Sequence, residues 1–295
     1  MKRVIAVDLG ATNVRVARIL ETGIIETREK DNVAGLNGKE ITEKIAALIT
    51  GQTDGTVSAI GISTAGPVDL ERGCVVGSPN MHAAEIELVK PLEEQFGLPV
   101  KMLTDCKAGV LGEYRFGAGT SCNNLAYLTI SSGIGCGVLQ NGMLIEGADG
   151  NAGEAGHFMV DTCYSMPCGC GGNGHWEGYC SGTNMPKFFA LWCKRHNKSC
   201  SEPDTEKILL QAEAGTEPYA SFAAEIKRFN AAGIQSVICA YNPSRIVLDG
   251  PVALHHRWLF SDLDLPYLRK PEIVFSGLNG NAPLLGAAAY ALEQS

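Results

Sequence analysis

The chain opens with the stretch VIAVDLGATN at residues 4–13, in which an apolar run ends at Asp8 and a small polar turn follows. A second stretch, LAYLTISSGIG at residues 125–135, repeats the order of apolar run and small Ser/Gly turn. Further apolar residues and the hairpin signal Asn141-Gly142 follow this second stretch. We therefore predict two related hairpin units, although any protein that alternates strands and helices contains similar strand–glycine-turn–strand segments.

The turns of both stretches carry groups suited to a phosphate, because their backbone N–H groups and hydroxyls can face an anion. Asp8 ends its predicted strand just before a glycine turn, a position suited to holding Mg²⁺ through water beside a polyphosphate. The alternative is plain turn chemistry. The candidate residues are Gly10, Thr12, Asn13, Ser132 and Gly133.

Strands and helices alternate through the rest of the first half. Residues 57–63 and 100–103 read as strands, and residues 40–49, 88–96 and 106–114 read as helices. This alternation predicts a mostly parallel sheet with helices on both faces, in which ligands bind beyond the carboxyl ends of the strands. Strand ends or loops of this kind hold Gly66, Asn80 and Asp105.

The second half is predicted to be rich in helices. Helices are expected at residues 184–195, 218–241 and 281–293, and a strand at residues 245–248. The run from Gly286 to Ala289 gives the last helix a flat face for close packing, or its alanines reflect helix propensity alone.

Four candidate metal ligands, His157, Cys168, Cys170 and His175, lie within 19 residues. Thiolate and imidazole are the ligands that zinc prefers, and four of them make a closed tetrahedral site. The alternative is a chance cluster of ordinary thiols, since the chain has 11 cysteines. The spacing favours zinc.

Composition limits the classes of function. A chain of 295 residues has room for two domains, and its net charge of −8 argues against a nucleic-acid-binding face. No apolar run is long enough to span a membrane, and the first residues lack the pattern of a signal peptide. We expect a cytoplasmic protein with reduced cysteines.

Taken in order, these segments resemble the ROK family of sugar kinases and sugar-responsive repressors over nearly the whole chain. The run from Cys168 to Glu177, preceded by Glu154-Ala-Gly-His157, is the most specific part of the resemblance. The matching segments are residues 6–13, 61–69, 78–80, 104–107, 129–137, 153–157, 168–182 and 242–250.

The resemblance implies an α/β, actin/hexokinase-like (ribonuclease H-like) fold, duplicated into two domains with the active-site cleft between them. The expected domains are residues 1–116 with the C-terminal helix at about 283–295, and residues 117–282 with the zinc loop.

The resemblance also implies transfer of a phosphoryl group from ATP, with Mg²⁺, to the 6-hydroxyl of a hexose. Asp105 matches the family's catalytic base, although aspartate also serves as a helix N-cap. The first and second phosphate motifs and the adenosine loop are expected to hold the nucleotide through Asp8, Gly10, Thr12, Asn13, Ser132, Gly133, Asp249 and Gly250.

Sugar contacts are expected from Gly66, Asn80, Asp105, Glu154, His157 and Glu177. His157 is expected to act twice, with one ring nitrogen on zinc and the other on a sugar hydroxyl. Solvated surface charge is the alternative for Glu154 and Glu177, and a plain turn is the alternative for Gly66.

Six positions depart from the family pattern. Ala11 replaces a glycine, which a negative φ would tolerate. Lys107 replaces a small or amide residue and is expected to point to solvent, with a phosphate contact as the alternative. The other departures are Ser131-Ser132 in the second phosphate motif, His175 in place of a cysteine, and Asp249 in place of a glycine.

Three functions follow from the resemblance. The first is a hexose kinase with glucose as the leading substrate and N-acetylmannosamine or N-acetylglucosamine next, working as a homodimer or homotetramer. The second, a repressor, is disfavoured because Asp8 lies near the start of the chain, where repressors carry a DNA-binding domain. The third is a sugar-binding protein that has lost catalysis.

Overall fold

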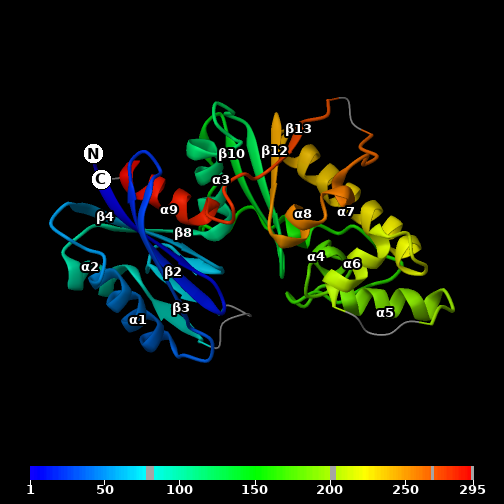
Figure 1. Ribbon diagram of the computed structural model, residues 1–295, viewed down its shortest axis with the longest axis horizontal. Coiled ribbons are helices and arrows are strands. Elements are labelled where there is room, and N and C mark those ends of the chain that lie inside the picture. The colour runs from blue at the N-terminus through cyan, green and yellow to red at the C-terminus, as the bar shows by residue number, and fades with distance from the viewer. Residues whose placement is uncertain (78–82, 200–203, 267–268, 294–295) are drawn as a thin grey trace. The chain divides into compact units, whose positions relative to one another are not determined.

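Two five-stranded sheets form the framework of the computed structural model, which describes residues 1–77, 83–199, 204–266 and 269–293. The first sheet has the strand order β3-β2-β1-β4-β8, and the second has the order β11-β10-β9-β12-β13. In each sheet, three strands that are consecutive in the chain are followed by two later strands (Figure 1). This repeated order matches the predicted pair of related hairpin units.

The elements of the first sheet match the predicted ranges to within two residues at each end. Its strands are β1 (Arg3–Leu9), β2 (Asn13–Leu20), β3 (Ile25–Asn32), β4 (Val57–Thr64) and β8 (Val100–Thr104). The helices that accompany it are α1 (Gly38–Thr50), α2 (Val89–Phe96), α3 (Asp105–Phe116) and α9 (Ala282–Glu293). A small antiparallel sheet of β5 (Val68–Asp69), β6 (Cys74–Val76) and β7 (Glu85–Glu87) was not predicted.

The strands of the second sheet lie on both sides of a helical region in the sequence. Its strands are β9 (Leu125–Ile130), β10 (Ile134–Gln140), β11 (Met143–Leu144), β12 (Arg245–Asp249) and β13 (Glu272–Phe275). The helices are α4 (Glu177–Cys180), α5 (Met185–Arg195), α6 (Thr205–Glu213), α7 (Tyr219–Tyr241) and α8 (Pro251–His255), with short 3-10 turns η1 (Ala155–His157) and η2 (Arg257–Phe260). Among the described residues, no helix is both long and apolar enough to cross a membrane.

The chain divides into two compact units. Unit 1 comprises Met1–Leu125, Gly137–Gly153 and Ser276–Ser295, and unit 2 comprises Ala126–Cys136 and Glu154–Phe275. The C-terminal helix α9 therefore belongs to unit 1, although it is last in the chain. The predicted boundary after residue 116 differs from this division, because residues 117–125 and 137–153 also belong to unit 1.

The core of unit 1 follows from the alternation of side chains along β1. Ile5 and Val7 pack in a buried cluster with Ile45 of α1, whereas Val4 and Ala6 pack in a second cluster with residues of α9. Successive side chains of a strand point to opposite faces, so α1 and α9 cover opposite faces of the first sheet (Figure 1).

The close contact between α9 and α3 requires small residues. A methyl group at Gly286 would lie 1.6 Å from the carbonyl oxygen of Ala108, so only glycine allows the two backbones to approach this closely. Ala287 and Ala288 are fully buried beside it. The small residues of α9 therefore form the predicted close-packing face, and helix propensity alone does not explain them.

Candidate functional site

The carboxyl ends of three parallel strands meet at one edge of the first sheet. Leu9 of β1 pairs with Thr64 of β4, and Thr64 pairs with Thr104 of β8. The segments that leave these strands therefore start side by side. This register brings Asp8, the turn after Thr64 and Asp105 to the same edge of unit 1.

Asp8 is paired within unit 1. Its Oδ2 accepts hydrogen bonds from Arg15 Nε at 2.9 Å and from Arg15 Nη2 at 2.6 Å, and its Oδ1 accepts one from the Ser63 hydroxyl at 3.1 Å. Because both carboxylate oxygens are engaged, the arrangement fits contact to Mg²⁺ through water better than direct coordination. The predicted magnesium role of Asp8 stays a prediction.

The first phosphate turn is compact. Gly10 N–H donates to the carbonyl oxygen of Asn13 at 2.9 Å, and the carbonyl oxygen of Thr12 accepts from Val33 N–H at 2.8 Å. The backbone at Ala11 lies outside the left-handed region, so the methyl group that replaces the family's glycine fits without strain.

Asp105 is the first residue of α3, directly after β8. Its Oδ1 accepts a hydrogen bond from Cys106 N–H at 2.7 Å, which fixes the orientation of the carboxylate. A methyl group at Gly66 would lie 3.6 Å from Thr104, an ordinary contact, so sterics alone do not require glycine there. Asn80 lies outside the described residues.

The prediction that Lys107 points to solvent is wrong. Lys107 is 1 % exposed, and its Nζ donates to the carbonyl oxygens of Glu146, at 2.9 Å, and of Gly150. Positions 107–113 of α3 are all buried, so this part of the helix has no solvent-facing side at which a lysine could lie.

The four predicted metal ligands come together in unit 2. One donor atom from each of His157, Cys168, Cys170 and His175 lies within 4.8 Å of the others. Nδ1 of His157 is 3.5 Å from Sγ of Cys168, and Nδ1 of His175 is 3.2 Å from Sγ of Cys170. Tetrahedral zinc with bonds of about 2.0–2.3 Å separates such ligand atoms by about 3.5 Å, so the donor set fits zinc.

The surroundings of this cluster favour the neutral thiol at Cys168. Burial raises the pKa of the Cys168 thiol to about 11. Only a thiolate coordinates zinc, so metal binding at this residue must release a proton.

His157 uses its two ring nitrogens in different directions. Nδ1 faces the thiol of Cys168, whereas Nε2 lies 3.6 Å from Oε2 of Glu154. Glu154 is exposed. This geometry is compatible with the predicted double role of His157, in which a metal on one nitrogen fixes the tautomer that the other presents.

Glu177 connects the metal-ligand cluster to the second phosphate turn. Its Oε2 accepts a hydrogen bond from Ile134 N–H at 2.9 Å, and its Oε1 lies 3.7 Å from Sγ of Cys168. Ile134 directly follows Gly133 of that turn. Glu177 is therefore a structural link within unit 2 rather than the solvated charge considered as an alternative, and its predicted contact with sugar is untested.

Buried polar pairs hold the metal-ligand loop in place. Trp176 Nε1 donates to Oδ1 of Asn230 on α7 at 2.9 Å. The Tyr179 hydroxyl donates to Asp161 at 2.9 Å and accepts from Met166 N–H at 3.1 Å.

These supporting contacts were not predicted from the sequence. Although burial opposes ionisation of Asp161, the hydrogen bonds it accepts from Tyr164 N–H and Tyr179 hold the pKa of its carboxyl below the usual range. The one sign of such support in the sequence is Trp176, which lies between the predicted site residues His175 and Glu177.

The second phosphate turn contacts two other segments of unit 2. Gly182 N–H donates to the carbonyl oxygen of Ser131 at 2.7 Å, and Thr183 N–H donates to that of Ser132 at 3.3 Å. Gly250 lies against Ile130, at the end of the strand that leads into the turn. The structure thus places Gly250 beside the end of the strand that leads into Ser132 and Gly133, and the nucleotide role of these residues stays a prediction.

Asp249 has a role inside the protein. It is 3 % exposed and accepts a hydrogen bond from the Tyr127 hydroxyl at 2.9 Å. Its other oxygen accepts from Gly250 N–H at 2.7 Å. These bonds occupy the side chain, so the predicted nucleotide contact at this position is more compatible with the backbone near Gly250 than with the Asp249 carboxylate.

Replacing Gly250 by alanine is expected to destabilise unit 2 by about 3 kcal/mol, because a methyl group would lie 2.4 Å from the Ile130 carbonyl oxygen at a φ of +89°. All three tryptophans, at 176, 192 and 258, lie in unit 2, so the urea midpoint of tryptophan fluorescence reports its unfolding. Gly215→Ala is the control, since Gly215 has a φ of +74° and no atom within 4 Å. It should cost about 1 kcal/mol, and equal losses in the two variants would contradict the crowding at Gly250.

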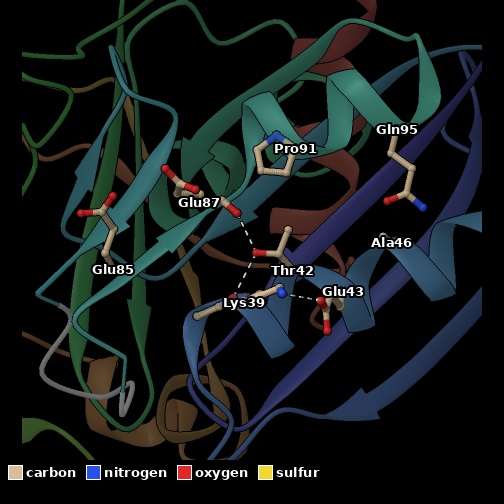
Figure 2. Close-up of a pocket in the computed structure, with 9 residues that line it drawn as sticks. Lys39, Thr42, Glu43, Ala46, Glu85, Glu87, Pro91 and Gln95 are labelled. Carbon is tan, nitrogen blue, oxygen red and sulfur yellow. Dashed lines mark hydrogen bonds and ion pairs between the residues drawn. The ribbon is translucent and has the colours of Figure 1, made fainter.

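Unit 1 also contains a hollow of about 560 Å³, which is lined by other residues (Figure 2). It is formed by α1, β7 and α2, and none of the predicted site residues lines it. Its polar groups bond to one another: the Thr42 hydroxyl donates to the Glu87 carbonyl oxygen at 2.6 Å, and Lys39 lies 3.6 Å from Glu43. The hollow therefore lies outside the predicted catalytic and binding site.

Comparison with known proteins gives consistent results. A sequence model described as the ROK family matches residues 4–294. A glucokinase of Pyrobaculum calidifontis is 34 % identical over 302 residues, covering 99 % of this chain and 96 % of the relative.

Solved structures show the same fold. A ROK family glucokinase from Streptomyces griseus, in complex with glucose and AMPPNP, has a TM-score of 0.79 and 28 % identity, with 99 % of each chain covered. A ROK hexokinase from Thermus thermophilus has a TM-score of 0.80 and 26 % identity, covering 99 % of this chain and 98 % of the other.

Proposed function

The chain belongs to the ROK family, and from this premise we propose that it transfers the terminal phosphoryl group of ATP to the 6-hydroxyl of a hexose. Relatives named glucokinase and the related glucose–AMPPNP complex support glucose as the preferred sugar. The alternatives are N-acetylmannosamine and N-acetylglucosamine. The observation that carries the proposal is the common sheet edge of unit 1, where the register of β1, β4 and β8 gathers Asp8, Gly66 and Asp105.

Asp105 acts as the general base. As the sugar hydroxyl oxygen bonds to the γ-phosphorus, the bond from that phosphorus to the bridging oxygen of ADP breaks, and the hydroxyl proton passes to the Asp105 carboxylate. The hydrogen bond from Cys106 N–H orients the carboxylate for this transfer.

The two phosphate turns hold the nucleotide. Backbone N–H groups and hydroxyls at Gly10, Thr12, Ser132 and Gly133 supply donors to phosphate oxygens. Mg²⁺ that enters with ATP would neutralise charge on the phosphates. Asp8, held by Arg15 and Ser63, would hold that ion through water.

Sugar recognition uses directional hydrogen bonds. Glu154, His157 and Glu177 of unit 2 supply donors and acceptors, and Asn80 and the backbone at Gly66 complete the proposed set. His157, Cys168, Cys170 and His175 would hold a zinc ion with a structural role, since four protein ligands would fill a tetrahedral site. A cytoplasmic location and a homodimeric or homotetrameric state remain predictions.

A panel of sugars tests the proposal directly. The zinc-loaded protein is incubated with MgATP and glucose, mannose, N-acetylmannosamine or N-acetylglucosamine, and release of ADP is followed. We expect release that depends on sugar and is fastest with glucose. Sugar binding without release of ADP would instead support the sugar-binding protein that lacks catalysis.

A further inference from the structure

The loop at residues 146–152 of unit 1 closes around the ammonium group of Lys107. Ala152 N–H donates to the carbonyl oxygen of Glu146 at 3.0 Å, and Lys107 Nζ donates to the same oxygen at 2.9 Å and to the carbonyl oxygen of Gly150. Lys107 is 1 % exposed. An ammonium group withdrawn from water is costly unless dipoles surround it, so Lys107 and the loop stabilise each other.

The same loop is fixed to the strand that follows Gly66. Asn151 Oδ1 accepts a hydrogen bond from Val68 N–H at 3.2 Å, and Asn151 Nδ2 donates to the Val68 carbonyl oxygen at 3.1 Å. Val68 begins β5 two residues after Gly66. A methyl group at Gly66 would lie 3.9 Å from Asn151 Oδ1, so the loop also adjoins the turn itself.

Lys107 is the third residue of α3, two residues after Asp105. The contacts therefore run in one chain, from the helix that carries Asp105 through Lys107 and the loop to Asn151, and from Asn151 to Val68. Both ends of this chain are segments that the proposed function assigns to the sugar.

We propose that Lys107 and Asn151 are positioning residues that set the placement of the Gly66 turn relative to Asp105, and thereby the fit of the sugar. This inference rests on the proposed function. A displacement of about 1 Å at a reacting or binding group can cost about 10²-fold in rate or affinity, so the loop is expected to matter without touching substrate.

Three variants test the proposal: Lys107→Met, Asn151→Ala and the double variant. For each single variant we expect KM for the sugar to rise about 30-fold, whereas KM for ATP stays within about twofold. Because the two residues act through one loop, the double variant is expected to exceed the larger single effect by less than about threefold. Lys90→Met is the control, since the Lys90 side chain is 81 % exposed, and it should leave all constants unchanged.

Asn151 is only half-buried, so Asn151→Ala keeps the test decisive if Lys107→Met does not fold. A sugar KM within about twofold of wild type in Asn151→Ala, or fully multiplicative effects in the double variant, would overturn the proposal. A purely structural role would lower the melting temperature and leave the ratio of the two KM values unchanged.

A measurement without turnover separates this inference from the proposed function. Hydrogen exchange should show faster exchange of the Ala152 amide in Lys107→Met, because the loop loses its central contact. Sugar affinity by calorimetry should fall by the same factor as KM rises. If the wild-type protein binds hexose but does not phosphorylate it, the proposed kinase activity is refuted. The calorimetric sugar affinity of the variants then still tests the positioning role of Lys107 and Asn151.

Discussion

Replacing Asp105 by asparagine is expected to reduce kcat about 10³-fold while sugar affinity stays within about tenfold of wild type. Asparagine has nearly the shape of aspartate and still accepts the hydrogen bond from Cys106 N–H, so α3 should keep its first turn. What is lost is the group that takes the hydroxyl proton. Steady-state kinetics with glucose, together with calorimetric titration of the sugar, separates the two effects.

Asp54→Asn is the matched control. Asp54 also accepts a backbone hydrogen bond, from Thr56 N–H at 2.9 Å. It precedes β4, however, and so lies at the amino end of that strand, whereas Asp105 follows the carboxyl end of β8. Its replacement should change kcat by less than about twofold. Turnover by Asp105→Asn comparable to that of wild type would show that Asp105 is not the base and acts only at the start of the helix.

Loss of the metal is expected to have the second largest effect. Cys170→Ser removes an exposed ligand, and we expect the zinc content to fall from one ion per chain to a small fraction of it. KM for the sugar should rise about 10–100-fold, because His157 and Glu154 lose the ion that fixes their loop. Zinc analysis by mass spectrometry and steady-state kinetics measure the two consequences.

Cys239→Ser controls for the loss of a thiol, since Cys239 is also exposed but lies on α7 away from the four ligands in sequence. It should retain full zinc and activity. Equal zinc content in Cys170→Ser and wild type would contradict the four-ligand site. Unchanged sugar affinity in zinc-depleted protein would contradict the supporting role of the metal.

The metal-ligand cluster and the sheet edge could be predicted because each depends on short-range patterns. The spacing from Cys168 to His175 places the ligands in one loop, and the glycine turns after β1 and β9 follow short apolar runs that are typical of buried strands. Strand and helix patterns alone leave the role of Asp105 open between base and cap, and the family resemblance favours the base.

The parts that could not be predicted depend on contacts between distant segments. Lys107 was expected in solvent because lysine is usually exposed, whereas its partners, Glu146 and Gly150, lie about 40 residues away in the sequence and offer only backbone carbonyls. The hydrogen bond between Tyr179 and Asp161 likewise follows no spacing rule. Asp249, read as a nucleotide ligand, pairs with Tyr127 across the second sheet, and only the three-dimensional arrangement shows this.

The most direct test of the account is a crystal structure of the zinc-loaded protein with glucose and a non-hydrolysable ATP analogue. We expect a carboxylate oxygen of Asp105 within about 3.2 Å of the sugar O6, and we expect the sugar O6 to face the terminal phosphorus. A sugar bound with its O6 beyond reach of Asp105, or an Asp105 carboxylate directed away from the sugar, would contradict it.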